Sequence, residues 1–219
     1  MERFKQYKKT LIITLIVTLL PILIGVVLWD KLPDQIATHF GANGEPDGWS
    51  SKLFAVVGLP MFICAAQIVC FFGTLSDPKK QRIDSKVLKL ILWICPVVSW
   101  LGAILSYGYS FGLKIDVNRL LSIFLGVVFI VIGNYLPKCR QNYTVGIKIP
   151  WTLYDEENWN QTHRIGGKAW VFAGVVVLIL GVTGIGSSWM SMAVILVAAF
   201  VPMVYSYMYY MKHRKEDEI

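Results

Sequence analysis

Residues 53–75 read LFAVVGLPMFICAAQIVCFFGTL, a run of 23 residues without a charged side chain. A helix of about 20 apolar residues crosses the roughly 30 Å hydrocarbon core of a bilayer, so this run is long enough to span a membrane. A helix on the surface of a soluble protein would instead carry its apolar residues in periodic stripes. The run therefore predicts a transmembrane helix.

Five further apolar runs surround this one, with short charged segments between them. The six runs are Leu11–Trp29, Leu53–Leu75, Val87–Ser110, Leu120–Leu136, Ala169–Ile185 and Trp189–Met211. The chain of 219 residues is 55% hydrophobic and only 16% charged, whereas soluble domains are nearer a quarter charged. The first run is longer than the core of a signal peptide, and no small-residue cleavage site follows Trp29. We expect an all-α integral membrane protein, a bundle of six transmembrane helices that retains the first.

Lysine and arginine are divided unevenly between the two sides of such a bundle. Of the 21 basic residues, 17 lie in the termini and in the connections on the same side as the termini. The remaining four are Lys31, Lys52, Lys114 and Arg119. Because cytoplasmic loops retain Lys and Arg, we expect a multi-pass cell-membrane protein with both termini in the cytoplasm.

Two long polar segments lie on opposite sides of the predicted bundle. Residues 30–52 are predicted to be extracellular, and residues 137–168 are predicted to be cytoplasmic. We expect residues 1–85 to form an amino-terminal helical hairpin of two membrane helices. Residues 86–219 are expected to form a domain of four membrane helices.

The predicted extracellular loop reads DKLPDQIATHFGANGEPDGWSSK and is rich in residues that favour turns. Ile36, Thr38 and Phe40 alternate with Ala37 and His39, which is typical of a strand. We therefore expect a compact, structured loop. Its candidate ligand-binding residues are His39, Phe40, Gly44, Asp47, Gly48 and Trp49.

A structural explanation of the same residues stays open. Asp47 could cap a turn, Trp49 could anchor the next helix at the membrane surface, and His39 could be solvated. One histidine beside Glu45 and Asp47, without defined ligand spacing, is a weak metal signal. We expect no metal site here.

The predicted cytoplasmic loop is long for a connection, which favours a structured and functional segment. Thr152 followed by Asp155 resembles the start of a helix, and the acidic residues 155–157 suit its first turn. We expect a short interfacial helix that ends near Gly166-Gly167. Trp159 and His163 would share one face of it, facing either the bilayer or a cytoplasmic partner.

Several function classes lack the residues that they need. The centres of the six runs hold no ionisable side chain, which argues against an ion-coupled transporter, and Gln67 is their most polar long side chain. No nucleophile, phosphate-binding or metalloprotease motif is present, so we expect no enzyme and no cofactor. The basic residues are dispersed, so we expect no direct nucleic-acid binding. A passive transporter or channel for a small or amphipathic solute remains an alternative, as does a less favoured enzyme centred on His163.

Two stretches of the chain resemble a known family. The outer LPDQIATHFGANGEPDGWSSK is similar to the amino-terminal domain of unknown function that precedes the SdpI domain, with its LP-x-x-I-x-x-H-F and G-x-P-D-G-W patterns. The inner GNYLPKCRQNYTVGIKIPWTLYDEENWNQTHRIGGK resembles the SdpI signature: G-N-x-x-P, N-x-x-x-G-I, P-W-T-L and W-x-x-T-H-R-x-G-G. Where the family commonly has Arg-Thr after Gly-Ile, this chain has Lys148 and Ile149. Lysine keeps the positive charge but lacks the planar fork of arginine.

The resemblance implies a bacterial, Gram-positive membrane immunity protein that is not an enzyme. Its ligand would be an extracellular toxic peptide. It further implies a sensor that holds a small helix-turn-helix repressor at the membrane. The residues that it implies for cytoplasmic signalling are Asn134, Pro137, Asn142, Gly146, Lys148, Pro150, Trp151, Thr152, Trp159, Thr162, His163, Arg164 and Gly167. Ile147, Leu153 and Gly166 also match the signature.

Overall fold

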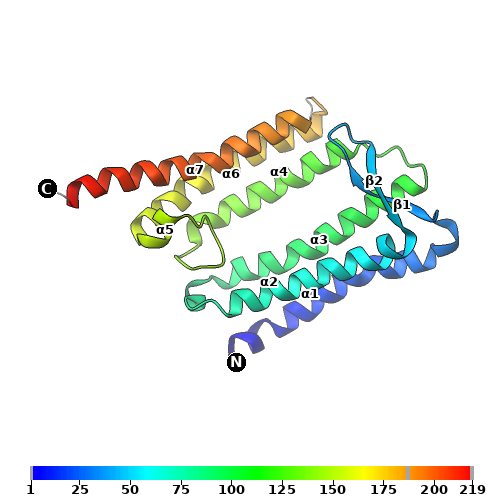
Figure 1. The fold of residues 1–219 in the computed structure, drawn as a ribbon, viewed down its shortest axis with the longest axis horizontal. Coiled ribbons are helices and arrows are strands. Elements are labelled where there is room, and N and C mark those ends of the chain that lie inside the picture. Colours follow the sequence, from blue (N-terminus) through cyan, green and yellow to red (C-terminus); the bar gives the residue numbers. More distant parts are fainter. Residues whose placement is uncertain (1, 186–187, 218–219) are drawn as a thin grey trace. The chain divides into compact units, whose positions relative to one another are not determined.

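The computed structural model describes residues 2–185 and 188–217, and most of these are helical (Figure 1). The link at residues 186–187 and the last two residues lie outside the described part of the chain. The long helices are α1 (Glu2–Val27), α2 (Leu59–Leu75), α3 (Ser85–Ser110), α4 (Val117–Tyr135), α6 (Glu156–Thr183) and α7 (Ser188–Asp217). The shorter elements are the strands β1 (Gln35–Phe40) and β2 (Pro46–Ser51) and the helix α5 (Pro150–Tyr154).

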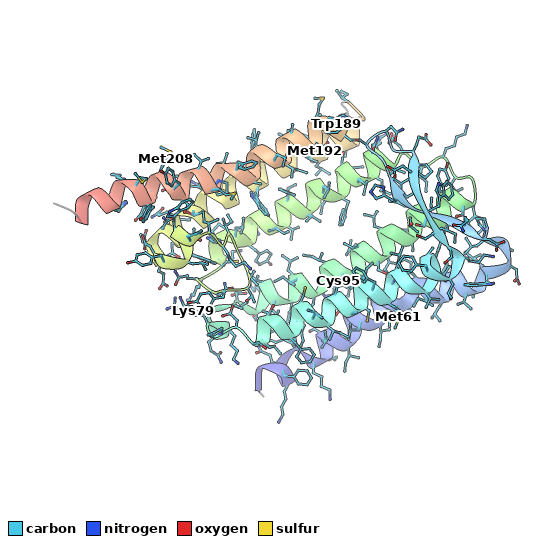
Figure 2. The ribbon with its side chains drawn as sticks, viewed as in Figure 1. Met61, Lys79, Cys95, Trp189, Met192 and Met208 are labelled. Atoms are coloured by element: carbon cyan, nitrogen blue, oxygen red, sulfur yellow. The ribbon has the colours of Figure 1, made fainter. Side chains whose placement is uncertain are left out.

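Six helical segments are long and apolar enough to cross a membrane, which confirms the six-helix prediction. They are Phe4–Val27, Phe54–Leu75, Ser85–Ser110, Val117–Lys138, Glu156–Thr183 and Ser188–His213. Only 17% to 33% of each apolar window is buried inside the protein. Large apolar side chains such as Met61 on α2 and Met192 and Met208 on α7, all labelled in Figure 2, are exposed. The chain is therefore a multi-pass helical membrane protein whose outer faces suit lipid.

The contacts divide the chain into two compact units. Unit 1 comprises the chain up to Ser76 together with Ser85–Val117, so it contains α1, α2, α3 and both strands. Unit 2 comprises Asp77–Asp84 and the chain from Asn118 on, so it contains α5, α6, α7 and almost all of α4. These units group α3 with the amino-terminal helices, so they do not coincide with the predicted division at residues 85 and 86. That division concerns sequence segments and stays a prediction.

Each of two prolines inside the helices of unit 1 leaves a backbone carbonyl without its usual helical donor. Proline has no N–H, so Pro21 in α1 and Pro96 in α3 cannot bond the carbonyls four residues earlier. The Val17 carbonyl instead accepts from the Trp100 indole N–H at 3.0 Å. The Leu92 carbonyl accepts from Gln67 Nε2 at 3.0 Å. Neighbouring helices thus supply the missing donors.

Gln67 is the centre of a buried polar network within unit 1. Its side chain is 1% exposed, and Nε2 also donates to Thr14 Oγ1 at 2.7 Å. The Thr18 hydroxyl lies 3.0 Å from Gln67 Oε1. Because no water is available in hydrocarbon, a polar side chain there must find such partners within the protein. The network joins α1, α2 and α3.

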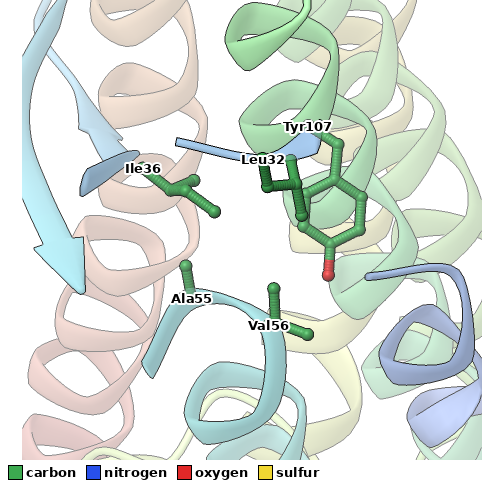
Figure 3. Close-up of a cluster of buried hydrophobic side chains, with 5 residues drawn as sticks. All are labelled: Leu32, Ile36, Ala55, Val56 and Tyr107. Atoms are coloured by element: carbon green, nitrogen blue, oxygen red, sulfur yellow. The ribbon is translucent and has the colours of Figure 1, made fainter. Parts of the chain in front are cut away.

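The strands form an antiparallel hairpin that is packed onto the helices of unit 1. Leu32 and Ile36 meet Ala55 and Val56 from the start of the second membrane helix and Tyr107 from α3 (Figure 3). All five side chains are buried. A strand is present at Gln35–Phe40, but the predicted alternation is not regular, because Ile36 and the adjacent Ala37 are both buried.

In unit 2, α4 and α6 approach closely at glycines. A methyl group added at Gly126 would lie 2.8 Å from the Gly174 carbonyl oxygen, and one added at Gly167 would lie 2.7 Å from that of Gly133. Small residues permit such close approach of membrane helices. Arg119 donates from Nε to the Gly181 carbonyl at 3.0 Å, near the carboxyl end of α6, where a cation is favourable.

The interfacial helix expected from Thr152 to Gly166-Gly167 is wrong at both ends. The chain forms the five-residue helix α5, breaks at Asp155, and then continues as one helix from Glu156 to Thr183. Asp155 is the amino-terminal cap of α6, since its carboxylate accepts from the Glu157 N–H at 2.8 Å. Gly166 and Gly167 lie within α6 and do not end it. Both are positions where other segments of unit 2 pack closely against the helix.

We predict that Trp100→Phe destabilises the protein by about 1 kcal/mol, because the Val17 carbonyl would then be buried without a donor. Trp93→Phe is the matched control, since Trp93 lies on the same helix and is 43% exposed. Unfolding of the purified protein in mixed detergent micelles measures both variants. Equal losses of stability would contradict the assigned role of the indole N–H.

Candidate functional site

The hairpin at residues 35–51 turns tightly and is irregular in register. Gly44 has a φ of 82°, a value that glycine adopts without strain, and the Asn43 side chain accepts from the Glu45 N–H at 3.1 Å. The register shifts between Ala37 and His39 and again between His39 and Phe40. These irregularities bring His39 opposite Gly48. A methyl group at Gly48 would lie 2.8 Å from His39 Cβ. The position of the His39 side chain therefore requires glycine at residue 48.

His39 and Asp47 form a pair on the exposed face of the hairpin. Their side chains are 74% and 55% exposed, and His39 Nδ1 hydrogen-bonds Asp47 Oδ1. Phe40 and Trp49 both make edge-on contacts with Tyr109, at centroid distances of 5.9 and 6.0 Å. The hairpin thus brings all six predicted ligand-binding residues into one small structure. It presents a polar pair beside aromatic side chains.

Asn142 organises the first half of the 137–168 loop. Its side-chain Nδ2 donates to the Arg140 and Val145 carbonyls at 2.8 and 2.9 Å. Its Oδ1 accepts from the N–H groups of Thr144 and Val145 at 2.9 and 2.7 Å. Asn142 is 1% exposed, and the amide is satisfied on both sides. This residue therefore folds the loop back on itself.

Trp159 and His163, in the second half of the 137–168 loop, pack against Gly146 from the first half. The rings of Trp159 and His163 stack at 4.1 Å, and Trp159 Nε1 donates to the Cys139 carbonyl at 2.7 Å. His163 Nε2 accepts from the Ile147 N–H at 2.9 Å, so its other nitrogen, Nδ1, carries the proton and donates to the Trp159 carbonyl at 2.8 Å. Gly146 has a φ of 125°, and a methyl group there would lie 2.5 Å from His163 Nε2. The loop can close on α6 only with glycine at this position.

Thr152 and Thr162 are also completely buried. The Thr152 hydroxyl lies 2.8 Å from the Ile147 carbonyl and accepts from the Ile149 N–H at 3.1 Å, which fixes the start of α5. Thr162 donates to Asn158 Oδ1 at 2.9 Å, and Ser206 of α7 donates to the same oxygen at 2.7 Å. Thr152 thus shapes the start of α5, and the shared bonds of Asn158 join α6 to α7 within unit 2.

The predicted signalling residues therefore divide into two groups. Asn142, Thr152, Trp159, Thr162, His163 and Gly167 are buried and bonded or packed within the fold, and the half-buried Gly146 packs against Trp159 and His163. Those with exposed surface are Asn134, Pro137, Lys148, Pro150 and Arg164, together with the half-buried Trp151. Trp151 is in α5, and its ring centroid lies 5.1 Å from that of Tyr207 on α7. Only this second group is placed to touch another molecule directly.

Sequence reasoning missed the part that Asp77 plays in this loop. The carboxylate is 3% exposed, and its Oδ2 accepts from the Tyr143 N–H at 2.9 Å and from the Thr144 hydroxyl at 2.6 Å. Burial raises the pKa of Asp77, but the hydrogen bonds from Thr144, Lys79 and Tyr143 more than offset it, so the net pKa is lowered. The ionised form thus stabilises the fold at neutral pH, and this contribution is lost as the pH falls through the lowered pKa.

Among the described residues, 2–185 and 188–217, no group of three or more His, Cys, Asp or Glu side chains is placed to hold a metal ion. Cys139 is buried just beyond the fourth span, and burial raises the pKa of its thiol to about 11. A thiol with so high a pKa is almost fully protonated at neutral pH, and so is a poor nucleophile and metal ligand.

Comparisons with known proteins agree with these two structured segments. Residues 138–206 match the SdpI/YfhL protein family, and residues 16–64 match a domain of unknown function, DUF1648. The chain is 24% identical over 192 residues to the Immunity protein SdpI of Bacillus subtilis (strain 168), which covers 85% of this chain and 89% of that protein. No solved structure matches the chain. The resemblance drawn from the sequence motifs is confirmed.

We predict that Gly146→Ala loosens the 137–168 loop, because the added methyl group meets His163 and Trp159 at 2.5 and 2.8 Å. Gly112→Ala is the matched control, since Gly112 also has a positive φ, of 70°, but no atom lies within 4 Å of the added methyl group. The control should cost about 1 kcal/mol for the backbone alone, and Gly146→Ala clearly more. Amide hydrogen exchange of residues 139–147 measures the loosening. Unchanged exchange in Gly146→Ala would contradict the packing assigned to this glycine.

Proposed function

We propose that this chain, in which residues 138–206 match the SdpI/YfhL family, is a non-enzymatic membrane immunity protein. It protects the cell that makes it against an extracellular toxic peptide. The observation that carries the proposal is the similarity to an immunity protein along most of both chains. The family matches at residues 16–64 and 138–206 include the hairpin and most of the 137–168 loop. The six-helix architecture and the lack of a metal cluster among the described residues are compatible with it.

The proposed orientation has both termini in the cytoplasm, since the excess of Lys and Arg lies on that side. The hairpin of residues 35–51 is then extracellular and is the surface that meets the toxin. Its exposed His39–Asp47 pair offers hydrogen-bonding groups, and Trp49, which is 53% exposed, offers apolar contact area. Aromatic side chains beside polar groups are common at binding surfaces.

The finer proposal is that the protein also senses the toxin and recruits a small helix-turn-helix repressor. The 137–168 loop is then cytoplasmic, and its buried hydrogen bonds hold a defined outer surface. Lys148, Pro150 and Arg164 are exposed there, and Tyr154 on α5 is 89% exposed. A surface that is fixed by buried bonds needs little ordering when it binds, which favours affinity for a partner.

Expression of this chain in a toxin-sensitive bacterium should raise survival under challenge with the toxic peptide. His39→Ala and Asp47→Ala should lower the tolerated toxin concentration about tenfold, which corresponds to about 1.4 kcal/mol of binding energy. Both residues are exposed, so the amount of protein in the membrane should stay the same. Gln35→Ala is the control, an exposed residue on the same strand. No survival benefit from the unmodified protein, when it is present in the membrane, would refute the immunity proposal.

Trp151→Ala and Arg164→Ala should reduce co-purification of the repressor about tenfold and leave membrane insertion unchanged. Lys168→Ala is the control for Arg164→Ala, since Lys168 is a basic, exposed residue on the same helix. The repressor bound to purified protein in nanodiscs is the quantity to measure. Full recruitment by both variants would rule out this surface.

A further inference from the structure

The connection between α2 and α3 belongs by its contacts to unit 2, although both helices belong to unit 1. This connection, residues 77–84, carries Asp77, Lys79 and Arg82, which we call the clamp. Lys79 is labelled in Figure 2, where it projects from the turn at the end of α2. Each of the three side chains bonds a residue of the loop or the first turn of α6.

Asp77 is the best-buried member of the clamp. Its Oδ1 accepts from the Lys79 N–H at 2.7 Å, which shapes the turn itself. Its Oδ2 accepts from the Tyr143 N–H and the Thr144 hydroxyl, which fixes the loop against the turn. A buried carboxylate without such donors would be strongly destabilising, so turn and loop hold each other in one arrangement.

Lys79 extends the contact to α5. Its Nζ donates to Gln141 Oε1, and Gln141 Nε2 donates in turn to the Thr152 and Leu153 carbonyls at 3.0 Å each. These carbonyls lie near the carboxyl end of α5, where helix carbonyls lack intrahelical donors. Lys79 also lies 5.1 Å above the ring of Tyr143. A movement of the turn would therefore reach α5 through Gln141.

Arg82 makes the third contact. Its guanidinium bonds Glu156 Oε2 at 2.9 Å, in the first turn of α6. Both side chains are about half exposed, so this ion pair adds orientation more than stability. The three contacts together reach the loop near residue 143, the end of α5 and the start of α6. A turn that only connected two helices through solvent would not need any of these three contacts.

We propose that the clamp is a positioning element that transmits movement of α2 and α3 to residues 139–157, and so controls the surface that the repressor would meet. The idea rests on the proposed function for its biological meaning, but the coupling itself is a property of the chain. The turn is covalently continuous with both helices, so a shift of their ends must move Asp77. A movement of the turn would disturb the Asp77 bonds to Tyr143 and Thr144 and the Lys79–Gln141 bond at the same time. Asp77 and Gln141 are each bonded to several groups of the loop or of α5.

A double-mutant cycle tests the coupling without any toxin or repressor. Gln67→Leu breaks the buried network between α1, α2 and α3 and should accelerate amide exchange in residues 139–157 about fivefold or more in nanodiscs. In an Asp77→Asn background the same change should have little additional effect, because the clamp is already released. Thr18→Val is a milder second perturbation of the same network, in case Gln67→Leu fails to fold.

Gln81→Ala is the control for Asp77→Asn, since Gln81 is an exposed residue of the same turn. Exchange in residues 139–157 should respond to Gln67→Leu in the Gln81→Ala background as it does in the unmodified protein. Strictly additive effects of Gln67→Leu and Asp77→Asn would overturn the proposal. So would an absence of any effect of Gln67→Leu and Thr18→Val on residues 139–157.

Function adds a separate readout. Asp77→Asn and Thr144→Val should leave toxin survival unchanged while they lower toxin-dependent repressor recruitment about fivefold or more. An equal fall of survival and recruitment would mean that the clamp serves only folding. If the unmodified protein gives neither survival nor recruitment, the proposed function fails, while the exchange cycle still decides the coupling.

Discussion

The structure depends on one constraint, which is that a polar group in hydrocarbon must find its hydrogen-bond partner inside the protein. The carbonyls that Pro21 and Pro96 release are therefore met by the side chains of Trp100 and Gln67 from neighbouring helices. Apolar contact alone distinguishes helix neighbours poorly in a membrane, because lipid is as apolar as leucine. These few bonds consequently decide which faces of α1, α2 and α3 meet.

Burial inside the protein imposes a similar requirement outside the membrane, which explains why the signature in the 137–168 loop is so polar. Asn142, Thr152 and His163 have their side chains turned inward, where they satisfy backbone groups of a segment with little regular secondary structure. A loop that is folded in this way is rigid without a large apolar core. The signature therefore describes the shape of the loop, and the neighbouring exposed residues decide what the loop can bind.

Much of the fold could be predicted from the sequence, because run length and strand alternation are local properties. The six spans and the strand at Gln35–Phe40 are of this kind, although the register shifts and the burial of both Ile36 and Ala37 were not predictable from alternation. The course of α6 through Gly166 and Gly167 was not predictable, since glycine ends helices in exposed chains but permits close packing between helices in a membrane. The role of Asp77 was missed for a different reason. Its partners Tyr143 and Thr144 are more than 60 residues away, and no spacing rule connects them.

An immunity protein that also senses its toxin must keep two surfaces and one connection between them. Replacing either member of the exposed His39–Asp47 pair on the hairpin costs folding little, since neither side chain belongs to the buried cluster beneath it. The buried bonds of the loop cannot be replaced in this way, because the loss of one leaves several backbone groups unsatisfied. The exposed residues His39 and Asp47 can therefore be replaced to test ligand contact separately from folding, and both lie within residues 16–64, which match DUF1648.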